Sequence, residues 1–156
     1  MNGFEIQPDY LPAADAMKLI REIQMELGDK ASAVHNGRSR IMRFGWDYLT
    51  DRNLGPKPDW LPAIDGFDSW TVNEYPPQHT IKPHFDAEKF DDRISILSLG
   101  ADSQIQFISP NSYRAMFKLP ARSLASMWGD LRWKWKHATL PADGWRYSVV
   151  YRKLKT

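Results

Sequence analysis

From residue 69 onward the chain consists of short strand-like runs separated by turn residues, and this pattern limits the fold more than any other feature. Turn signals such as Pro76-Pro77, Gly129-Asp130 and Asp143-Gly144 fall between the runs. Repeated short strands with such punctuation predict an all-β sandwich or barrel. The expected strands cover residues 69–75, 81–86, 93–99, 104–108, 113–118, 122–127, 131–138 and 145–152.

The N-terminal part predicts a helix that packs on this sheet. Apolar residues recur at spacings of three and four from Ala13 to Leu27, with Pro12 at the start and Gly28 at the end. Residues 52–66 contain three prolines and two glycines and form a loop-rich connection. A length of 156 residues indicates one domain, 1–156.

His84, Asp86 and His137 are candidate metal ligands. On a strand, residues two apart point to the same face, so His84 and Asp86 offer an imidazole and a carboxylate to one metal while Phe85 faces away. With His137 the set becomes two histidines and one carboxylate, the facial triad that leaves open positions on non-haem Fe(II). A His-x-Asp pair also arises often by chance, so the pair alone does not establish a metal site.

The last predicted strand has a face suited to an anion. A planar guanidinium binds a carboxylate through two parallel hydrogen bonds, so a dicarboxylic oxo-acid fits this face. Arg146 and Arg152 lie about 20 Å apart on an ideal strand. Either both side chains lean inward to reach one small ligand, or the two arginines have different roles. Alternatively, Arg152 belongs to a basic surface with Lys153 and Lys155. The face consists of Arg146, Ser148, Val150 and Arg152.

These motifs, in this order, resemble those of the AlkB family of Fe(II)/2-oxoglutarate dioxygenases. The resemblance runs from Ser69 to Arg152 and covers about half of the chain. The matching runs are Asn73-Glu74-Tyr75 for N-x-Y, His84-Phe85-Asp86 for H-x-D, Ser95–Gly100 for S-x-S-L-G, Leu119–His137 for the approach to the distal histidine, and Arg146–Arg152 for R-x5-R.

The resemblance implies a mainly β fold, a double-stranded β-helix or jelly roll, with the amphipathic helix packed on the sheet. It divides the single domain into an N-terminal helix and lid-like segment, 1–68, and a catalytic core, 69–156. His84, Asp86 and His137 are then the catalytic Fe(II) ligands. The expected contacts to the co-substrate 2-oxoglutarate are Arg146, at its distal carboxylate, with Asn73, Tyr75 and Arg152.

The segment Phe44-Gly45-Trp46-Asp47-Tyr48 is expected to help select the substrate. A base taken out of its stack is typically held between aromatic or apolar faces, and in the AlkB family the corresponding region is part of a nucleotide-recognition lid. Trp46 and Tyr48 are the candidates for this platform, although both rings equally suit the core. Glu88 either accepts a hydrogen bond from an exocyclic amine or faces solvent.

The net charge of +2 does not by itself indicate a polyanionic partner. Local clusters are more informative, because Arg38, Arg40 and Arg43 precede the aromatic segment. In the expected strand 131–138, basic residues alternate with aromatic ones, so the basic side chains face outward. Such charges either solvate a strand or contact phosphates of a nucleic acid.

Composition excludes several classes of protein. Without cysteine there is no disulfide framework, no thiolate zinc site and no cysteine nucleophile. The first residues lack the basic and apolar regions of a signal peptide, and no apolar run approaches about 20 residues. We expect a cytoplasmic protein with no membrane partner, and a monomer by default.

Three functions remain open. The first is an AlkB-type dioxygenase that uses Fe(II), 2-oxoglutarate and dioxygen for oxidative dealkylation or hydroxylation of a modified nucleobase in DNA or RNA. The second is an oxygenase of the same fold that hydroxylates a protein or a small molecule. The third is a non-catalytic jelly-roll binding module, against which the intact ligand set argues. The aromatic pair and the basic clusters favour a nucleic acid.

Overall fold

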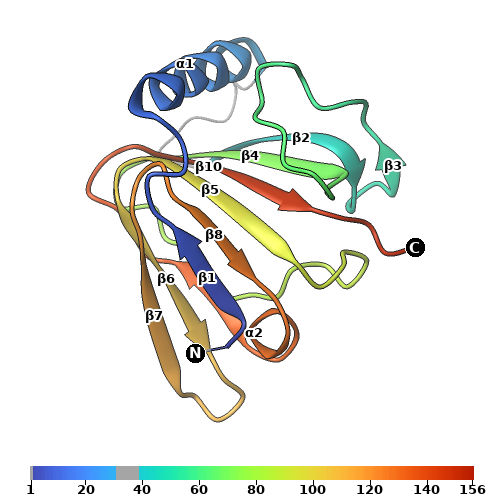
Figure 1. The fold of residues 1–156 in the computed structure, drawn as a ribbon, viewed down its shortest axis with the longest axis vertical. Coiled ribbons are helices and arrows are strands. Elements are labelled where there is room, and N and C mark those ends of the chain that lie inside the picture. The colour runs from blue at the N-terminus through green and yellow to red at the C-terminus, as the bar shows by residue number, and fades with distance from the viewer. Residues whose placement is uncertain (1, 31–38) are drawn as a thin grey trace.

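Two antiparallel sheets and one long helix form the molecule (Figure 1). The computed structural model describes residues 2–30 and 39–156. The larger sheet has the strand order β1-β8-β5-β10-β4-β2-β3 and the smaller one the order β7-β6-β9. The strands are β1 (Phe4–Gln7), β2 (Arg40–Asp47), β3 (Arg52–Asn53), β4 (Ser69–Tyr75), β5 (Ile94–Gly100), β6 (Ser103–Ile108), β7 (Arg114–Leu119), β8 (Leu124–Met127), β9 (Lys136–Thr139) and β10 (Arg146–Arg152).

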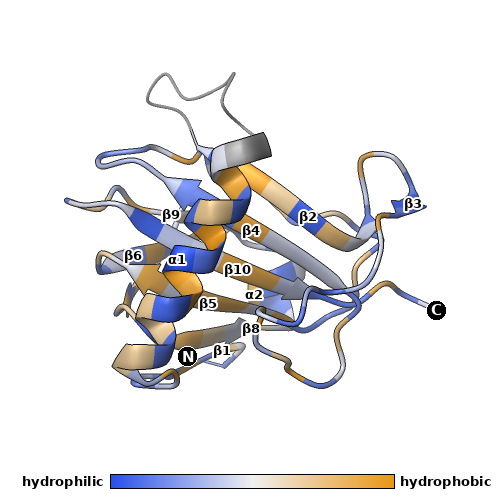
Figure 2. Ribbon diagram, turned by 90° about the horizontal axis from the view of Figure 1, so that it is seen from above, coloured by the Kyte–Doolittle hydropathy of each residue, from blue (hydrophilic) through white to orange (hydrophobic). Residues whose placement is uncertain are grey.

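Helix α1 (Ala13–Lys30) lies across the larger sheet and buries its apolar stripe there (Figure 2). Leu19, Ile23 and Leu27 are buried in one cluster with Val72 of β4 and Val149 of β10. The predicted amphipathic helix and its packing are therefore confirmed. The predicted end at Gly28 is two residues early, because the helix continues to Lys30. Within residues 2–30 and 39–156, no helix combines the length and the apolar character needed to cross a membrane.

Strand β10 lies at the centre of the larger sheet, between β4 and β5, and its side chains alternate as predicted. Tyr147, Val149 and Tyr151 face the core under α1. Val150 points the other way, into a second core that joins the larger sheet to the smaller one. The two cores thus lie on opposite faces of one sheet, and the polar residues beside Val150 are held between the sheets.

Two predicted strands are wrong. The run 131–138 begins as a helical turn, α2 (Asp130–Trp133), and only its end is a strand, β9. The chain can turn before α2 because Gly129 adopts a φ of 62°, a conformation that favours glycine. The run 81–86 forms only an isolated bridge between His84 and His137, and Pro83 has no N–H with which to extend a ladder.

The sequence pattern did not predict strands β1, β2 and β3. Strand β1 pairs with β8, and β2 pairs with β4, so residues from both 1–68 and 69–156 contribute to the larger sheet. Gly45 within β2 has a φ of 72°, and a side chain there would overlap the carbonyl oxygen of Asp68. The glycine thus permits a close backbone approach in β2, rather than marking a loop.

We expect Tyr151→Phe to lower the free energy of unfolding by about 1 kcal/mol, because one hydrogen bond is lost. The Tyr151 hydroxyl donates to the Pro62 carbonyl oxygen at 2.8 Å. Burial raises the pKa of Tyr151, so its contribution is present below about pH 10 and is lost as the pH rises through the raised pKa. Urea unfolding at pH 8 and at pH 11 measures both effects.

The matched control for this experiment is Tyr113→Phe, because the Tyr113 side chain is exposed. The control should leave stability within about 0.5 kcal/mol of the parent at both pH values. Equal losses in the two variants would contradict the role of the Tyr151 hydroxyl.

Candidate metal centre and co-substrate cavity

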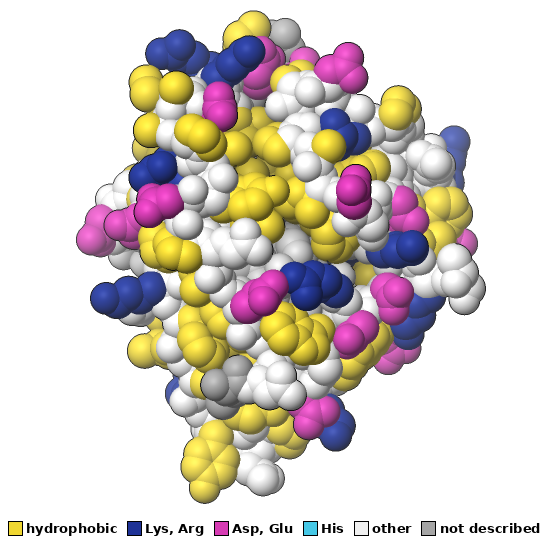
Figure 3. All heavy atoms as spheres, viewed as in Figure 1, with side chains coloured by type: hydrophobic (Ala, Val, Ile, Leu, Met, Phe, Trp, Pro, Cys, Tyr) yellow, Lys and Arg dark blue, Asp and Glu magenta, His cyan; other side chains and the backbone are white. Residues whose placement is uncertain are grey.

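A cavity of about 330 Å³ lies on the face of the larger sheet opposite α1. Side chains from β2, β4, β5, β9 and β10 line it, together with residues 79–81, His84 and Asp86. Its size is at the lower end of the range for pockets that bind small molecules. Figure 3 shows one face of the molecule, on which charges of both signs are interspersed and no histidine is visible.

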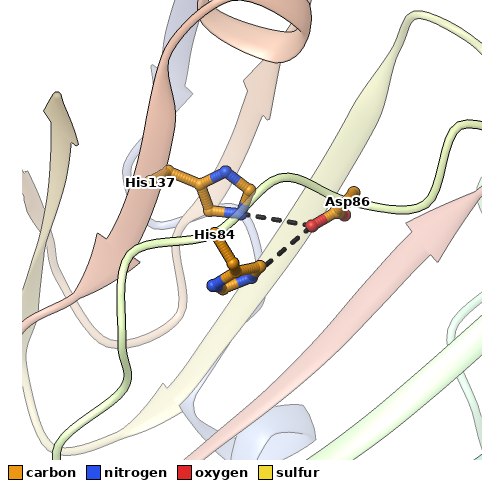
Figure 4. Close-up of side chains that lie close together, drawn as sticks. All are labelled: His84, Asp86 and His137. Carbon is orange, nitrogen blue, oxygen red and sulfur yellow. Dashed lines mark ion pairs between the residues drawn. The ribbon is translucent and has the colours of Figure 1, made fainter. Parts of the chain in front are cut away.

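The three predicted metal ligands meet at this cavity. Asp86 Oδ1 lies 3.6 Å from His84 Nε2 and 3.3 Å from His137 Nε2. One ligand atom from each residue lies within 4.8 Å of the others. Figure 4 shows the two imidazoles converging on the carboxylate, one from β9 and the other from the irregular segment between β4 and β5.

The donor set fits Fe(II). His84 Nδ1 lies 2.8 Å from the Lys82 carbonyl oxygen, so this nitrogen donates a proton and Nε2 keeps its lone pair. That lone pair faces the Asp86 carboxylate at 3.6 Å. The lone pair and the carboxylate repel one another unless a cation lies between them. Partial burial, reinforced by His137, lowers the pKa of His84 and favours the neutral imidazole that binds metals. Two imidazoles and one carboxylate form the facial set typical of non-haem Fe(II) oxygenases.

Arg152 holds the second oxygen of Asp86. Its Nε donates to Asp86 Oδ2 at 2.7 Å, and one terminal nitrogen donates to the Thr71 hydroxyl at 3.0 Å. Burial alone would raise the pKa of Asp86, but Arg152 and His137 hold it well below its usual range. Asp86 is therefore ionised, with Oδ2 fixed by Arg152 and Oδ1 directed at the histidines.

We expect Arg152→Gln to weaken Fe(II) binding by about tenfold to 100-fold, the usual effect of removing a partner of a metal ligand. Glutamine retains an N–H donor but loses the charge that orients and neutralises Asp86. Anaerobic titration with Fe(II) measures the affinity. As a control, Arg93→Gln removes an exposed arginine paired with Glu5 at 2.6 Å and should leave it unchanged. Unchanged affinity in Arg152→Gln would mean that Arg152 does not support the metal ligand.

Arg132 is a positioning residue that the sequence did not reveal. It is buried in α2, and its guanidinium donates to the main-chain oxygens of Asp86, Ala87 and Phe90 at 2.9 to 3.1 Å. It thereby ties the loop that carries Asp86 to the turn before β9. In the predicted strand 131–138, alternation would have pointed Arg132 toward solvent. Residues 130–133 instead form a helical turn, which directs Arg132 inward.

Arg146 is buried at the other side of the cavity. One terminal nitrogen donates to Ser98 Oγ at 3.1 Å, and the guanidinium lies 5.4 Å from the Tyr75 ring centroid. Burial lowers its pKa, which the interaction with Tyr75 opposes. Within the described residues, Arg146 has no carboxylate partner and its Nε has no hydrogen-bond partner. Because a buried unpaired charge is costly, the carboxylate of a small ligand would stabilise this site.

Asn73 and Tyr75, the other expected co-substrate contacts, line the same cavity from β4. The Asn73 amide donates to Ser148 Oγ at 3.1 Å, and the Tyr75 ring stacks on His79 with centroids 5.5 Å apart. All four predicted co-substrate contacts, Arg152 included, therefore surround one space. Their roles toward 2-oxoglutarate stay predictions.

The structure separates the three predicted substrate contacts. Tyr48 lines the cavity, with the Arg43 guanidinium 5.5 Å from its ring centroid. Trp46 does not line the cavity, and Glu88 is exposed outside it. Of the basic cluster before this segment, Arg43 lines the cavity, Arg40 pairs with Glu74 at 2.6 Å, and Arg38 lies outside the described residues.

The chain has relatives in sequence and in structure among known proteins, but no family model matches it. The chain is 41% identical over 161 residues to tRNA (carboxymethyluridine(34)-5-O)-methyltransferase alkbh8 of Xenopus tropicalis, which aligns with 89% of the chain and 25% of the relative. It is 31% identical over 161 residues to ALKBH8 of Mus musculus, with 89% of the chain and 24% of the relative covered. The chain thus spans about a quarter of the length of these relatives.

Two solved structures share the fold over nearly the whole chain. OsALKBH1 matches with a TM-score of 0.73 and 15% identity over 98% of this chain and 99% of that one. A Pseudomonas putida prolyl-4-hydroxylase matches with a TM-score of 0.65 and 17% identity over 98% and 93%. The chain therefore has an AlkB-like Fe(II)/2-oxoglutarate oxygenase fold, and the predicted jelly roll is confirmed. In sequence, the chain is homologous to part of ALKBH8.

Proposed function

We propose that the chain is an Fe(II)/2-oxoglutarate-dependent dioxygenase that oxidises a modified nucleobase in DNA or RNA, by dealkylation or hydroxylation. The observation that supports this most strongly is one cavity containing both the His84, Asp86 and His137 cluster and the buried guanidinium of Arg146. A non-catalytic binding module has no need of both. A cytoplasmic location and a monomeric state stay predictions.

The residues of the chain have separate tasks in this reaction. When bound, iron and 2-oxoglutarate supply the oxidation of a carbon–hydrogen bond, coupled to decarboxylation of the co-substrate to succinate. His84, Asp86 and His137 would hold the metal, and Arg146 would pair with the distal carboxylate of the co-substrate. Arg152 keeps Asp86 ionised and oriented.

The walls of the cavity also contain apolar side chains. Ile96 and Val150 provide apolar surface in the same cavity as the predicted metal ligands. If the oxidised carbon is bound to a base nitrogen, the alcohol formed there is a hemiaminal, which breaks down to an aldehyde and the unmodified base. Demethylation is the simplest case of this reaction.

A nucleobase substrate is supported by sequence relatives and by the cavity wall. The names of the ALKBH8 relatives refer to a tRNA uridine. This chain matches only about a quarter of the length of those proteins. Tyr48 and Arg43 form an aromatic and cationic wall of the cavity. Aromatic faces are typical holders of a base removed from its stack.

The test is succinate formation in the presence of Fe(II), 2-oxoglutarate and oligonucleotides that contain methylated or otherwise alkylated bases. We expect modified oligonucleotides to stimulate succinate release and to change in mass by loss of the alkyl group or gain of one oxygen. Unmodified oligonucleotides of the same sequence are the control. If only a protein or a small molecule stimulates succinate release, the dioxygenase assignment is retained and the nucleobase substrate is rejected.

A further inference from the structure

The smaller sheet has an outer face that is exposed along β7, at Arg114, Met116 and Lys118, and at Lys136 of β9, whereas Gln106 and Ala138 on the same face are buried. Ile105, Phe107 and Leu119 of this sheet point inward, into the core shared with the larger sheet. Because strand residues alternate, the residues between them point outward. The outward positions are Gln104, Gln106 and Ile108 of β6, Arg114, Met116 and Lys118 of β7, and Lys136 and Ala138 of β9.

All charged side chains at these outward positions are cationic. They are Arg114, Lys118 and Lys136, each of them exposed, and we call this surface the basic face. Within residues 2–30 and 39–156, none of the three forms an ion pair. Some other exposed cations of the chain do, such as Lys89 with Asp51 at 2.6 Å and Lys134 with Asp130 at 3.2 Å.

Two carboxylates lie close to one end of the basic face. Asp102 and Asp143 share a surface hollow with Lys118. Asp102 accepts a hydrogen bond from the Ala121 N–H at 2.8 Å, and Asp143 accepts one from the Gln78 side chain at 2.9 Å. Both carboxylates thus have other partners, and the cations of the basic face remain available to an anion.

The basic face leads directly to the metal ligands. Arg114, Ile108 and Lys136 lie in register across the three strands, so the two charges are about 10 Å apart at the backbone. Lys136 precedes the ligand His137, and its Nζ lies 6.0 Å from the ring centroid of Phe85. Phe85 is 47% exposed and stands between His84 and Asp86. A row of cations therefore ends at an exposed aromatic ring beside the metal site.

We propose that the basic face binds the phosphate backbone of the nucleic-acid strand whose target base enters the cavity, and that Phe85 stacks on a neighbouring base. This inference rests on the proposed nucleobase substrate. Unpaired exposed cations match the regular negative charge of a phosphate backbone, and such contacts position a strand without reading its sequence. An exposed aromatic ring among cations is the usual stacking platform for single-stranded bases.

The test is the salt dependence of binding to a fluorescein-labelled single-stranded oligonucleotide, measured by anisotropy. Each phosphate contact contributes about 0.7 to the slope of log K against log salt concentration for single strands. The triple variant Arg114→Gln, Lys118→Gln, Lys136→Gln should therefore lower the slope by about 2 and weaken binding by about 100-fold at 0.1 M salt. Phe85→Ala should weaken binding by about fivefold to 100-fold, as expected for one stacked base, without changing the slope.

The control variant removes three exposed cations elsewhere, by Lys18→Gln, Arg21→Gln and Lys153→Gln, and should keep the parent slope. Fe(II) affinity, measured in each variant, shows that the metal site has not been disturbed. An equal loss of slope in both triple variants, or an unchanged slope in the first, would overturn the proposal.

The result is distinguishable from a failure of the proposed function. If the parent does not bind the oligonucleotide but forms succinate with a protein or a small molecule, the basic face and the nucleobase substrate are both rejected, and the dioxygenase is retained. If the parent binds and the first triple variant does not, while neither oxidises modified bases, the basic face is supported and the choice of modified base is wrong.

Discussion

Replacing Asp86 with alanine should abolish substrate-dependent succinate formation, a loss of at least about 1,000-fold. The carboxylate is the only anionic ligand in the cluster, and its Oδ1 lies between the two histidines. Without it, only the two imidazoles remain, and they cannot neutralise a divalent cation. Loss of several kcal/mol of metal stabilisation corresponds to at least three powers of ten in rate. Succinate release and anaerobic Fe(II) titration measure the two effects together.

A second variant separates the loss of metal from a loss of folding. Removing Asp86 also leaves Arg152 without its ion pair, and breaking a buried pair costs about 3–5 kcal/mol of stability. The His84 side chain is nearly half exposed, at 46%, so His84→Ala should remove a ligand with little cost to the fold. Succinate formation at the parental rate by either folded variant would contradict the metal assignment.

Replacing Arg146 with alanine should raise the KM for 2-oxoglutarate by about 100-fold. Hydrogen bonds to charged groups contribute about 1.5–3 kcal/mol each, and about 2.7 kcal/mol corresponds to 100-fold. Arg146 is 3% exposed and has no carboxylate partner among the described residues. The distal carboxylate of the co-substrate would provide this partner. Initial rates of succinate formation against 2-oxoglutarate concentration give the KM.

The control for Arg146 is a co-substrate rather than a second mutation. A 2-oxo acid without a distal carboxylate, such as 2-oxobutanoate, cannot pair with the guanidinium. The parent should therefore prefer 2-oxoglutarate strongly, and Arg146→Ala should lose most of that preference. If Arg146→Ala retains the preference for 2-oxoglutarate, another residue binds the distal carboxylate, and Arg152 would be the next residue to test.

Much of the fold followed from local signals. The helix was visible in its apolar spacing, and β4, β5, β6, β7 and β10 were visible as runs between turn residues. Strand β2 was not predicted, and the close approach to Asp68 that requires its central glycine, Gly45, cannot be seen in the local sequence. Strand β1 has only four residues, and its pairing with β8 depends on chain segments about 120 residues apart. Such pairing leaves little trace in the local pattern.

The clustering of His84, Asp86 and His137 could be predicted from residue type, although 81–86 is not a strand, and the polar face of β10 could be predicted from period-two spacing. Arg132 could not, because its role depends on main-chain oxygens that only the folded loop brings together. Trp46 was predicted to contact the substrate, but it does not line the cavity. An aromatic residue next to a glycine in the sequence does not show whether its ring lines a cavity. Sequence spacing thus predicts side chains that act along one strand better than those that act across loops.

Two of the three predicted ligands, His84 and His137, are also joined through their main chains. The His84 N–H donates to the His137 carbonyl oxygen at 3.0 Å, and the His137 N–H donates to the His84 oxygen at 2.9 Å. If the register between these two segments shifted by one residue, one imidazole would point to the opposite face and leave the cluster. Holding a metal and holding this register are therefore thermodynamically linked, since each stabilises the other. The amide protons of these two histidines would consequently exchange more slowly with solvent as the metal binds, and would report metal occupancy without any turnover.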